Sequence, residues 1–334
     1  MVMARTDKPN SSALTLLEVV VVLAIIAVIA ALILPAIFAA RGAALHIDCS
    51  NRLRQLGLAL QNYSGDWGCF PPRLIVSPGI FPPPGPWGSH VCLLPYVEQG
   101  NLYNALNHGL FAQDAANATV TSMSPSVFLC PSDAIPTAFT YGFANYAACV
   151  GSGLFPDGLD AKMDSSMLVP SDGLFFGLHG VKPAECTDGL SHTAAFSEIV
   201  HGGSLIARMG LNLPPPPTPG LEYTFMPFSP PTQRKLIELC TGLESSSSIR
   251  SADPAGMAWF QFVVYDHLLT PNQPRCWGPG GDAFSAMTAS SRHPGMVHVV
   301  FGDGHVSAIP NSIDLVIWRA LGSRNKGEVI DQSF

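Results

Sequence analysis

The sequence contains little charge. Asp, Glu, Lys and Arg together make up 12% of the 334 residues, against roughly 25% in a typical soluble domain. The 17 Lys and Arg residues form no basic run, which gives no support to a nucleic-acid-binding surface. Hydrophobic residues reach 47%, which argues against a disordered chain and provides for a sizeable core. The formal net charge of -7 fits the acidic surface of an exported protein.

The sequence also lacks the common catalytic motifs. It has no nucleophile elbow, zincin helix, phosphate loop or dinucleotide fingerprint. Asp188, Ser191 and His192 supply the residue types of a hydrolase triad. The adjacent Ser191 and His192 project in different directions, however, and a turn is sufficient to explain them. We therefore expect a non-enzymatic protein without a cofactor or a bound metal, and keep an anchored hydrolase as a remote alternative.

Closely spaced cysteine pairs are absent as well. The eight cysteines are spread from Cys49 to Cys276 without a CxxC pair, which argues against zinc-ribbon and thioredoxin patterns. In an exported domain some cysteines can form disulfides, or they can be small buried side chains. Cys49 and Cys130 are candidates for either state, because the sequence leaves the connectivity open.

Glycine and proline are abundant, with 31 and 30 residues. Their abundance favours strands, turns and long ordered loops over helices. Prolines are concentrated at 71–86 and 214–231, where their density predicts surface loops rather than central strands or helices. The second stretch leads into a serine tract at 245–248. We therefore expect an insertion at about 212–250.

One long hydrophobic run lies near the N-terminus. Residues 19–40 are 22 consecutive uncharged residues, ending at Arg41. A helix of this length crosses a hydrocarbon core of about 30 Å, and it is longer than the apolar part of an ordinary cleaved signal. The run therefore predicts a single transmembrane helix.

A lone carboxylate lies at the start of this helix. Glu18 follows the apolar stretch 13–17, and an unpaired carboxylate is costly in lipid. If the chain is cut after Ala13, the new amino group at Leu14 lies about one helical turn from Glu18 and can pair with it. Arg5 and Lys8 precede the cut and favour a cytoplasmic N-terminus.

These residues resemble the type IV prepilin signature. The resemblance implies that Ala13 is the last leader residue, Leu14 the N-methylated first mature residue, and Glu18 the assembly glutamate. Ala13 replaces the usual glycine and Leu14 the usual phenylalanine, but one is small and the other apolar, as the signature requires. The resemblance also implies processing by a prepilin peptidase and insertion in the inner membrane, with pilin-like subunits as candidate partners. The alternative is an uncleaved signal anchor.

The helix is expected to continue beyond the membrane. Leu53, Leu56, Leu60 and Tyr63 recur at three- and four-residue spacing, which predicts an apolar helical face that covers a sheet. The pattern stops near Gly65. The helix is therefore predicted at 14–64. Leu93–Gln99 and the residues after it predict further short helices, with Tyr96 and Tyr103 packed on the core.

Later blocks resemble a planctomycete-type family of prepilin-like proteins of unknown function with a C-terminal His-x9-Asp-Gly motif. The motif residues here are His293, Asp303 and Gly304. The other matching blocks are Asn51–Tyr63, Phe70–Pro72, Leu93–Gln99, Phe128–Asp133, Asn145–Tyr146 and Thr187–Thr193. Their order across nearly the whole chain carries the resemblance more than any single block.

The motif lies in a predicted hairpin. Two β-branched runs, 296–301 and 305–309, flank Gly302-Asp303-Gly304, which predicts a tight turn. His293 and Asp303 would lie at opposite ends of one strand, about 30 Å apart if fully extended, too far for direct pairing. His298 and His305 would face each other, either as a structural pair or as two ligands of a zinc ion.

Two acidic turns and a final helix complete the pattern. Ser132-Asp133 and Thr187-Asp188-Gly189 have the chemistry of turns or helix caps, and calcium ligation is the weaker alternative. Residues 313–322 predict a short amphipathic helix, with Trp318 in the core.

The sequence thus predicts an α+β protein in which a pilin-like helix, its first half transmembrane, packs on an antiparallel sheet domain with long loops. We expect a leader at 1–13, the helix at 14–64 with its membrane span at 19–40, and an exported domain at 65–334. The expected function is that of a pilin- or pseudopilin-like subunit, a candidate for a type IV pilus or type II secretion-like filament. The alternative is a monomeric, membrane-anchored extracytoplasmic binding domain.

Overall fold

The computed structural model describes residues 16–75, 87–133, 141–154, 171–175, 177–200, 223–225, 232–242, 258–261, 263–273, 275–278 and 281–328. The chain divides into two compact units, residues 1–47 and 48–334. The leader and the residues on either side of the expected cut, Ala13 and Leu14, lie outside the described residues.

Helix α1, Leu16–Trp67, supplies the described part of the first unit. Its large apolar side chains are exposed within the chain, including Leu32 at 71% and Phe38 at 68%. Pro35 lies inside the helix without ending it. Among the described residues, α1 is the one helix long and apolar enough to cross a membrane. This agrees with the expected single transmembrane helix.

In the second unit, the last part of α1 belongs to the core. Leu53, Leu56 and Leu60 are completely buried, and Tyr63 is 9% exposed, so the predicted apolar face is confirmed. The helix ends at Trp67, three residues beyond the predicted end at 64. Gly68 stops it: its φ is +70°, and its N–H donates to the Ser64 carbonyl at 2.9 Å, as is typical of a glycine after a helix.

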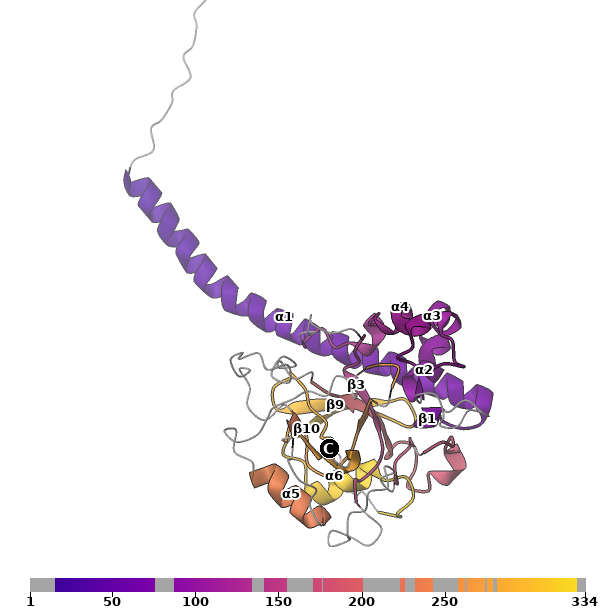
Figure 1. Cartoon of the computed structure of the whole chain (residues 1–334). Coiled ribbons are helices and arrows are strands. Elements are labelled where there is room, and N and C mark those ends of the chain that lie inside the picture. The colour runs from indigo at the N-terminus through magenta and orange to yellow at the C-terminus, as the bar shows by residue number, and fades with distance from the viewer. Residues whose placement is uncertain are drawn as a thin grey trace, which may run out of the picture. The chain divides into compact units, whose positions relative to one another are not determined.

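The second unit is a mixed α+β domain (Figure 1). Its other helices are α2 Ser89–Leu93, α3 Gly100–Ala105, α4 Ala118–Thr121, α5 Gln233–Gly242 and α6 Leu315–Gly322, with 3-10 turns η1 Leu94–Val97, η2 Ala115–Asn117, η3 Ser126–Phe128 and η4 Pro183–Glu185. Its strands are β1 Leu74–Ile75, β2 Trp87–Gly88, β3 Tyr146–Cys149, β4 Ala194–Glu198, β5 Tyr223–Phe225, β6 Val264–Tyr265, β7 Arg275–Gly278, β8 Gly281–Ala286, β9 Met296–Phe301 and β10 Val306–Pro310.

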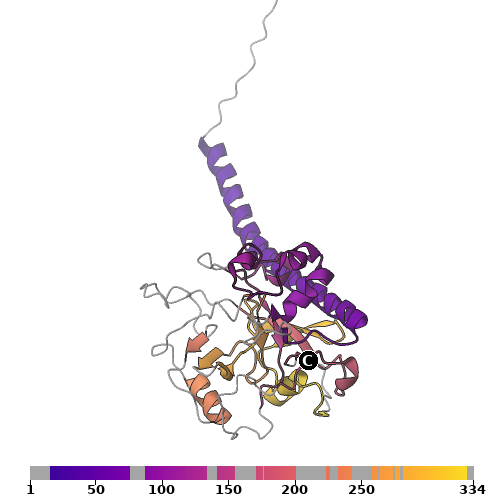
Figure 2. The same ribbon diagram turned by 45° about the vertical axis from the view of Figure 1, so that its right-hand side comes forward.

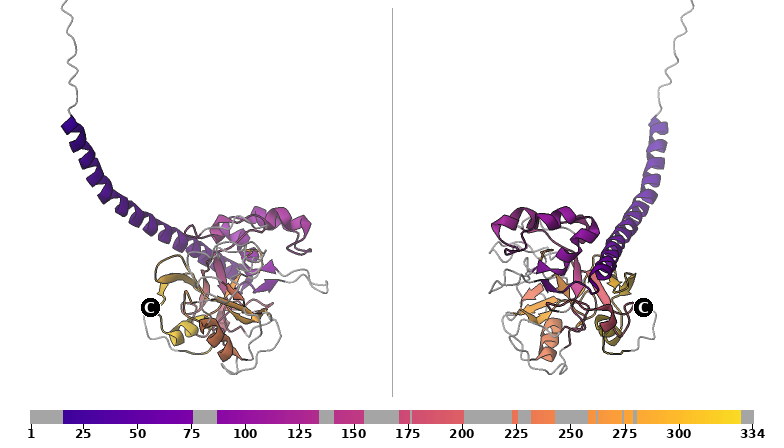
Figure 3. Two further views of the ribbon diagram at one scale, coloured as in Figure 1. Left: turned by 60° about the vertical axis from the view of Figure 1, so that its left-hand side comes forward. Right: turned by 90° about the vertical axis from the view of Figure 1, so that its right-hand side faces the viewer.

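A five-stranded sheet with the order β10-β9-β4-β3-β6 forms the centre of the domain. The contacts of β3 show what covers its two faces. The Tyr146 hydroxyl donates to the Cys49 carbonyl of α1 at 3.1 Å, whereas the Cys149 thiol faces the Gly322 carbonyl of α6 at 4.0 Å. Because side chains alternate along a strand, α1 and α6 cover opposite faces. Figure 2 shows this arrangement, and Figure 3 shows the short helices α2–α4 on the α1 side.

The sheets are mixed rather than purely antiparallel. β3 pairs with β6 in parallel, and β5 pairs with β7 in parallel in a separate three-stranded sheet of order β5-β7-β8. The prediction of an antiparallel sheet is therefore wrong at these two pairs. Both parallel pairs join segments far apart in the sequence, which local residue patterns do not specify.

Two further sequence predictions need correction. The proline-rich stretch 214–231, predicted to form surface loops, contains an edge strand, β5. Helix α5, whose Leu236 and Cys240 are buried, lies within the insertion expected at 212–250, which stays a prediction. β5 itself contains no proline and lies at a sheet edge, where neighbouring prolines are tolerated. Tyr103, expected in the core, is exposed and packs on the ring of His108 instead. Trp318 lies in the core as predicted, completely buried on α6.

Candidate functional site

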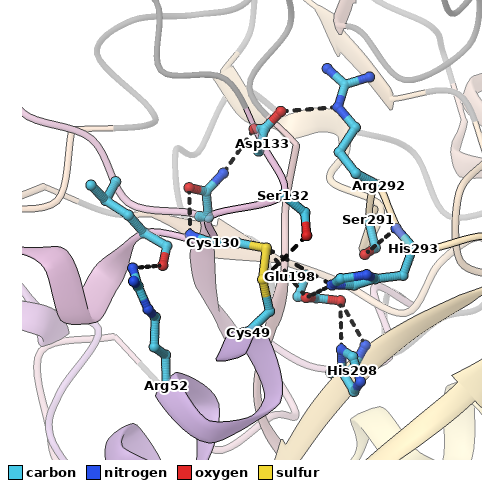
Figure 4. Close-up of a disulfide and its surroundings, with 12 residues drawn as sticks. Cys49, Arg52, Cys130, Ser132, Asp133, Glu198, Ser291, Arg292, His293 and His298 are labelled. Atoms are coloured by element: carbon cyan, nitrogen blue, oxygen red, sulfur yellow. Dashed lines mark hydrogen bonds and ion pairs between the residues drawn. A yellow bond between two sulfur atoms is a disulfide. The ribbon is translucent and has the colours of Figure 1, made fainter. Parts of the chain in front are cut away.

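A buried group of polar side chains lies where α1 meets the five-stranded sheet (Figure 4). It is fastened by a disulfide between Cys49 of α1 and Cys130, which follows η3. Arg52, one turn further along α1, donates to the carbonyls of Ser126 and Leu129 at 2.5 and 2.6 Å. Of the two states considered for these cysteines, the structure shows the disulfide, which links two segments 81 residues apart in sequence.

Asn145 connects the disulfide segment to an ion pair. Its side-chain carbonyl accepts from the Cys130 N–H at 2.9 Å, and its amide donates to Asp133 Oδ2 at 2.9 Å. The other oxygen of Asp133 pairs with Arg292 Nε at 2.9 Å. Residues 131–133 form the predicted turn, in which the Asp133 N–H donates to the Cys130 carbonyl at 3.0 Å. The Asp133 carboxylate is held by an amide and a guanidinium.

Glu198, at the end of β4, lies between two histidines. Its Oε1 is 3.2 Å from His293 Nε2. Its Oε2 is 3.2 Å from His298 Nδ1 and accepts the His298 N–H at 2.9 Å. All three side chains are at most 5% exposed. The backbone N–H of His293 donates to Ser291 Oγ at 3.1 Å, which fixes the loop that carries this histidine.

The carboxyl of Glu198 is held in its charged form. Burial by itself raises its pKa, but hydrogen bonds from His293 and His298, together with their charges, outweigh burial and lower the pKa to about 2. The group is therefore a buried carboxylate between two histidine side chains.

Four of these residues could hold a metal ion. Ligand atoms of Cys49, Cys130, Glu198 and His293 all lie within 4.8 Å of one another, and all four residues are buried. The Cys130 sulfur lies 3.9 Å from both Glu198 Oε1 and His293 Nε2. While the sulfurs are bonded to each other, neither can act as a thiolate ligand.

The structure separates the residues of the His-x9-Asp-Gly motif. His293 belongs to the buried group, whereas Asp303 lies at the far end of β9, where its Oδ1 is 2.6 Å from His305 Nδ1 on the exposed turn. The sequence-based expectation that His293 and Asp303 do not pair is confirmed. The hairpin is also confirmed, because β9 and β10 pair antiparallel around this turn.

Gly304 lies outside the buried group and allows α1 to pack closely against the hairpin turn. Its φ is +90°, and a Cβ built on Gly57 of α1 would lie 2.8 Å from the Gly304 carbonyl and 2.7 Å from a methyl of Val300. The Gln61 side-chain amide donates to the adjacent Gly302 carbonyl. The motif turn is thus a docking point for α1.

The alternative pairings considered from the sequence are wrong. His298 lies opposite Ala308 in the hairpin and is buried beside Glu198, while His305 stacks on Phe301. They form neither a structural pair nor a zinc fragment with each other, because the register places them on different rows of the ladder.

The triad residue types do not form a triad. Ser191 Oγ is 3.3 Å from His192 Nδ1, but Asp188 accepts the backbone N–H groups of Lys326 and Gly327 at 2.9 and 2.7 Å. Asp188 accepts backbone hydrogen bonds, as expected of a turn or cap residue. Their donors lie far away in sequence, so Asp188 fixes the C-terminal segment to the domain.

Sequence reasoning missed Glu198 and Arg292. A signal for Glu198 was present, since it is the only charged residue in the run Thr193–Val200, and a lone carboxylate in a buried strand requires partners. Glu18, which lies within α1, is likewise a lone carboxylate in an apolar segment.

Two family patterns match the chain. The family described as a protein of unknown function (DUF1559) matches residues 38–316, and the prokaryotic N-terminal methylation motif matches residues 8–34. No curated protein and no solved structure matches. The methylation motif, together with the apolar part of α1, indicates a membrane-anchored, single-pass, exported protein that is processed by a prepilin peptidase. The resemblance drawn from the sequence is confirmed: the chain belongs to the DUF1559 family and has a prepilin-type N-terminus.

Proposed function

We propose that the protein is a non-enzymatic, pilin-like subunit that assembles with other pilin-like chains through the first half of α1. The observation that carries the proposal is the exposure of this segment within the chain. From Leu16 to Phe38 its large apolar side chains have exposed fractions between 44% and 84%. Lipid can cover them before assembly, and the helices of neighbouring subunits can replace lipid afterwards.

Glu18 gives such assembly a defined register. A carboxylate near the start of an apolar helix is stabilised by a cation, and the methylated amino group at Leu14 of a neighbouring chain supplies one. The pairing would work between chains as well as within one. In the second unit, by contrast, Glu198 and Asp133 are buried and already paired, which supports a structural rather than a catalytic role for this polar group.

We also propose that the second unit lies outside the cytoplasm, on the periplasmic or extracellular side. Arg5 and Lys8 of the leader favour a cytoplasmic N-terminus, and the Cys49–Cys130 disulfide fits an oxidising compartment. Protease added to spheroplasts should digest the domain. A domain that is protected until the membrane is lysed would contradict this orientation.

Assembly can be tested by crosslinking the full-length chain in intact cells. The wild type should give a ladder of multimers, and Glu18→Ala should lose it. Glu238→Ala, which removes an exposed carboxylate on α5, serves as the matched control and should keep the ladder. The mass of each variant must show that it is still processed.

A wild type that yields only monomers would support the alternative, a membrane-anchored binding domain. A ladder that is equally strong in Glu18→Ala would refute the role of Glu18.

A further inference from the structure

We propose that Cys49, Cys130, Glu198 and His293 form a zinc site when the disulfide is reduced, so that Zn²⁺ replaces the disulfide as the link between α1 and the β-sheet domain. This inference does not depend on the proposed assembly function. It concerns a set of side chains that the assembly surface does not use.

The geometry of the four residues fits a tetrahedral ion. With Zn–S bonds of about 2.3 Å and Zn–N or Zn–O bonds of about 2.0 Å, the edges of the coordination tetrahedron are about 3.3–3.8 Å. The distances from the Cys130 sulfur to His293 Nε2 and Glu198 Oε1 are both 3.9 Å, and His293 Nε2 is 3.2 Å from Glu198 Oε1. Three edges are therefore close to their required lengths. The sulfur of the fourth ligand, Cys49, lies within 4.8 Å of the other three ligand atoms. Once the disulfide is opened, it must move to about 3.8 Å from the Cys130 sulfur to complete the tetrahedron.

The surroundings hold the ligands in place. Glu198 Oε2 is fixed by His298, through both its ring and its N–H, which leaves Oε1 directed at His293 and Cys130 (Figure 4). The Ser132 hydroxyl lies 3.7 Å from the Cys49 sulfur, within reach of a hydrogen bond to a thiolate. Such neighbouring hydrogen bonds are typical of protein metal sites, because they orient the ligands.

The ligand set favours zinc over other ions. Thiolate, imidazole and carboxylate are all ligand types that Zn²⁺ takes in four-coordinate sites, whereas Mg²⁺ and Ca²⁺ prefer oxygen ligands. All four residues are buried, and together they supply the four ligands of a tetrahedral ion. The site would therefore be structural.

The disulfide is neutral and needs no charged neighbours. A charged carboxylate, held by His293 and His298, nevertheless lies beside it, with Glu198 Oε1 3.9 Å from the Cys130 sulfur. A divalent cation at the centre gives the carboxylate and His293 a common function. Cys49 and Cys130 then serve in both states, as a covalent link when oxidised and as metal ligands when reduced.

The exchange is chemically balanced. A dithiol reductant transfers two electrons to the Cys49–Cys130 bond and becomes a cyclic disulfide, which leaves two protein thiols. Zn²⁺ then binds the two sulfurs as thiolates, and two protons are released to solvent. In the reverse direction, a disulfide oxidant accepts two electrons from the two thiolates and becomes a dithiol, the Cys49–Cys130 bond forms again, and the ion is released.

The test uses the full chain in detergent, with and without a dithiol reductant, followed by removal of unbound Zn²⁺ and elemental analysis. The reduced wild type should retain about one zinc ion per chain, and the oxidised form should retain none. His293→Ala should weaken zinc binding by more than the roughly 10- to 100-fold that follows loss of a neighbouring hydrogen bond. His305→Ala removes an exposed histidine outside the group, and should bind zinc as the wild type does.

A reduced wild type that takes up no zinc, folded or not, would overturn the proposal. So would equal zinc contents in the reduced and oxidised forms, or in wild type and His293→Ala. Co²⁺ provides a measurement on the wild type alone, independent of whether a variant folds. The reduced chain should show thiolate-to-cobalt charge-transfer absorption and the intense visible bands of a tetrahedral ion, and a spectrum without the thiolate band would also refute the site.

Discussion

The disulfide allows a quantitative prediction about the junction between α1 and the sheet domain. Cys49 and Cys130 are 81 residues apart. Closing a loop of this length removes conformational entropy from the unfolded chain that corresponds to about 4.5 kcal/mol at 25 °C. Replacing both cysteines by alanine should therefore lower the free energy of unfolding of the second unit by about 4.5 kcal/mol, in a metal-free buffer.

Guanidinium unfolding of the full chain in detergent measures this effect. Trp87, Trp259 and Trp318 are at most 2% exposed, so their fluorescence reports on the core. For a domain of this size, the dependence of the unfolding free energy on denaturant is about 6 kcal/mol per molar, and the midpoint should fall by about 0.7 M.

The control is Cys186→Ala, which removes a buried free thiol without opening a cross-link. It should shift the midpoint much less than the double variant does. If the double variant unfolds at the midpoint of the wild type, although mass spectrometry shows the wild type to be oxidised, the entropic reasoning is refuted.

Three further predictions concern the same domain. The folded pKa of Glu198 is about 2, below its ordinary 4.5, so the carboxylate stabilises the fold above that ordinary value and the contribution is lost as the pH falls toward 2. The pKa shift of Glu198 should therefore make the free energy of unfolding of the wild type about 3 kcal/mol larger than that of Glu198→Gln near neutral pH. Roughly 2 kcal/mol of this difference should be lost by about pH 3. Gly57→Ala should destabilise by about 1–3 kcal/mol, because the new methyl meets Val300 and the motif turn. Asp314→Ala should cost about 1 kcal/mol, because Asp314 caps α6 by accepting two backbone N–H groups.

Each of these predictions has its own check. A difference between wild type and Glu198→Gln that stays constant from about pH 7 to pH 3 would show that the carboxylate is not specially stabilised. Gly65→Ala is the control for Gly57→Ala, because a Cβ there meets no atom within 4 Å, and it should stabilise the helix by about 0.5–1 kcal/mol. Equal effects at both glycines would refute the close packing of α1. Thermal unfolding measures the Asp314 variant, and an unchanged midpoint would show that the cap contributes nothing.

The elements set by local pattern could be predicted from the sequence. The spacing of Leu53, Leu56 and Leu60 indicated the buried face of α1, and the two β-branched runs around Gly302–Gly304 indicated the hairpin. In both cases residues close in sequence determine the structure, through helical periodicity or turn chemistry. The resemblance to prepilins likewise rested on a short continuous segment.

The buried polar group could not be assembled in this way. Its members come from α1, the segment after η3, the end of β4 and β9 with the loop before it, so only the tertiary fold brings Cys49, Cys130, Glu198 and His293 together. The parallel pairing of β3 with β6 was missed for the same reason. Glu198 illustrates the limit, since its burial in an apolar strand predicts that it has partners but does not name them.

The central claim is that the chain is a processed, prepilin-type membrane protein. Mass spectrometry of the N-terminus of the native protein tests it most directly. We expect a mature chain that begins with N-methylated Leu14, cut after Ala13, with Glu18 as its fifth residue. An intact leader, or a cut at any other position, would contradict it.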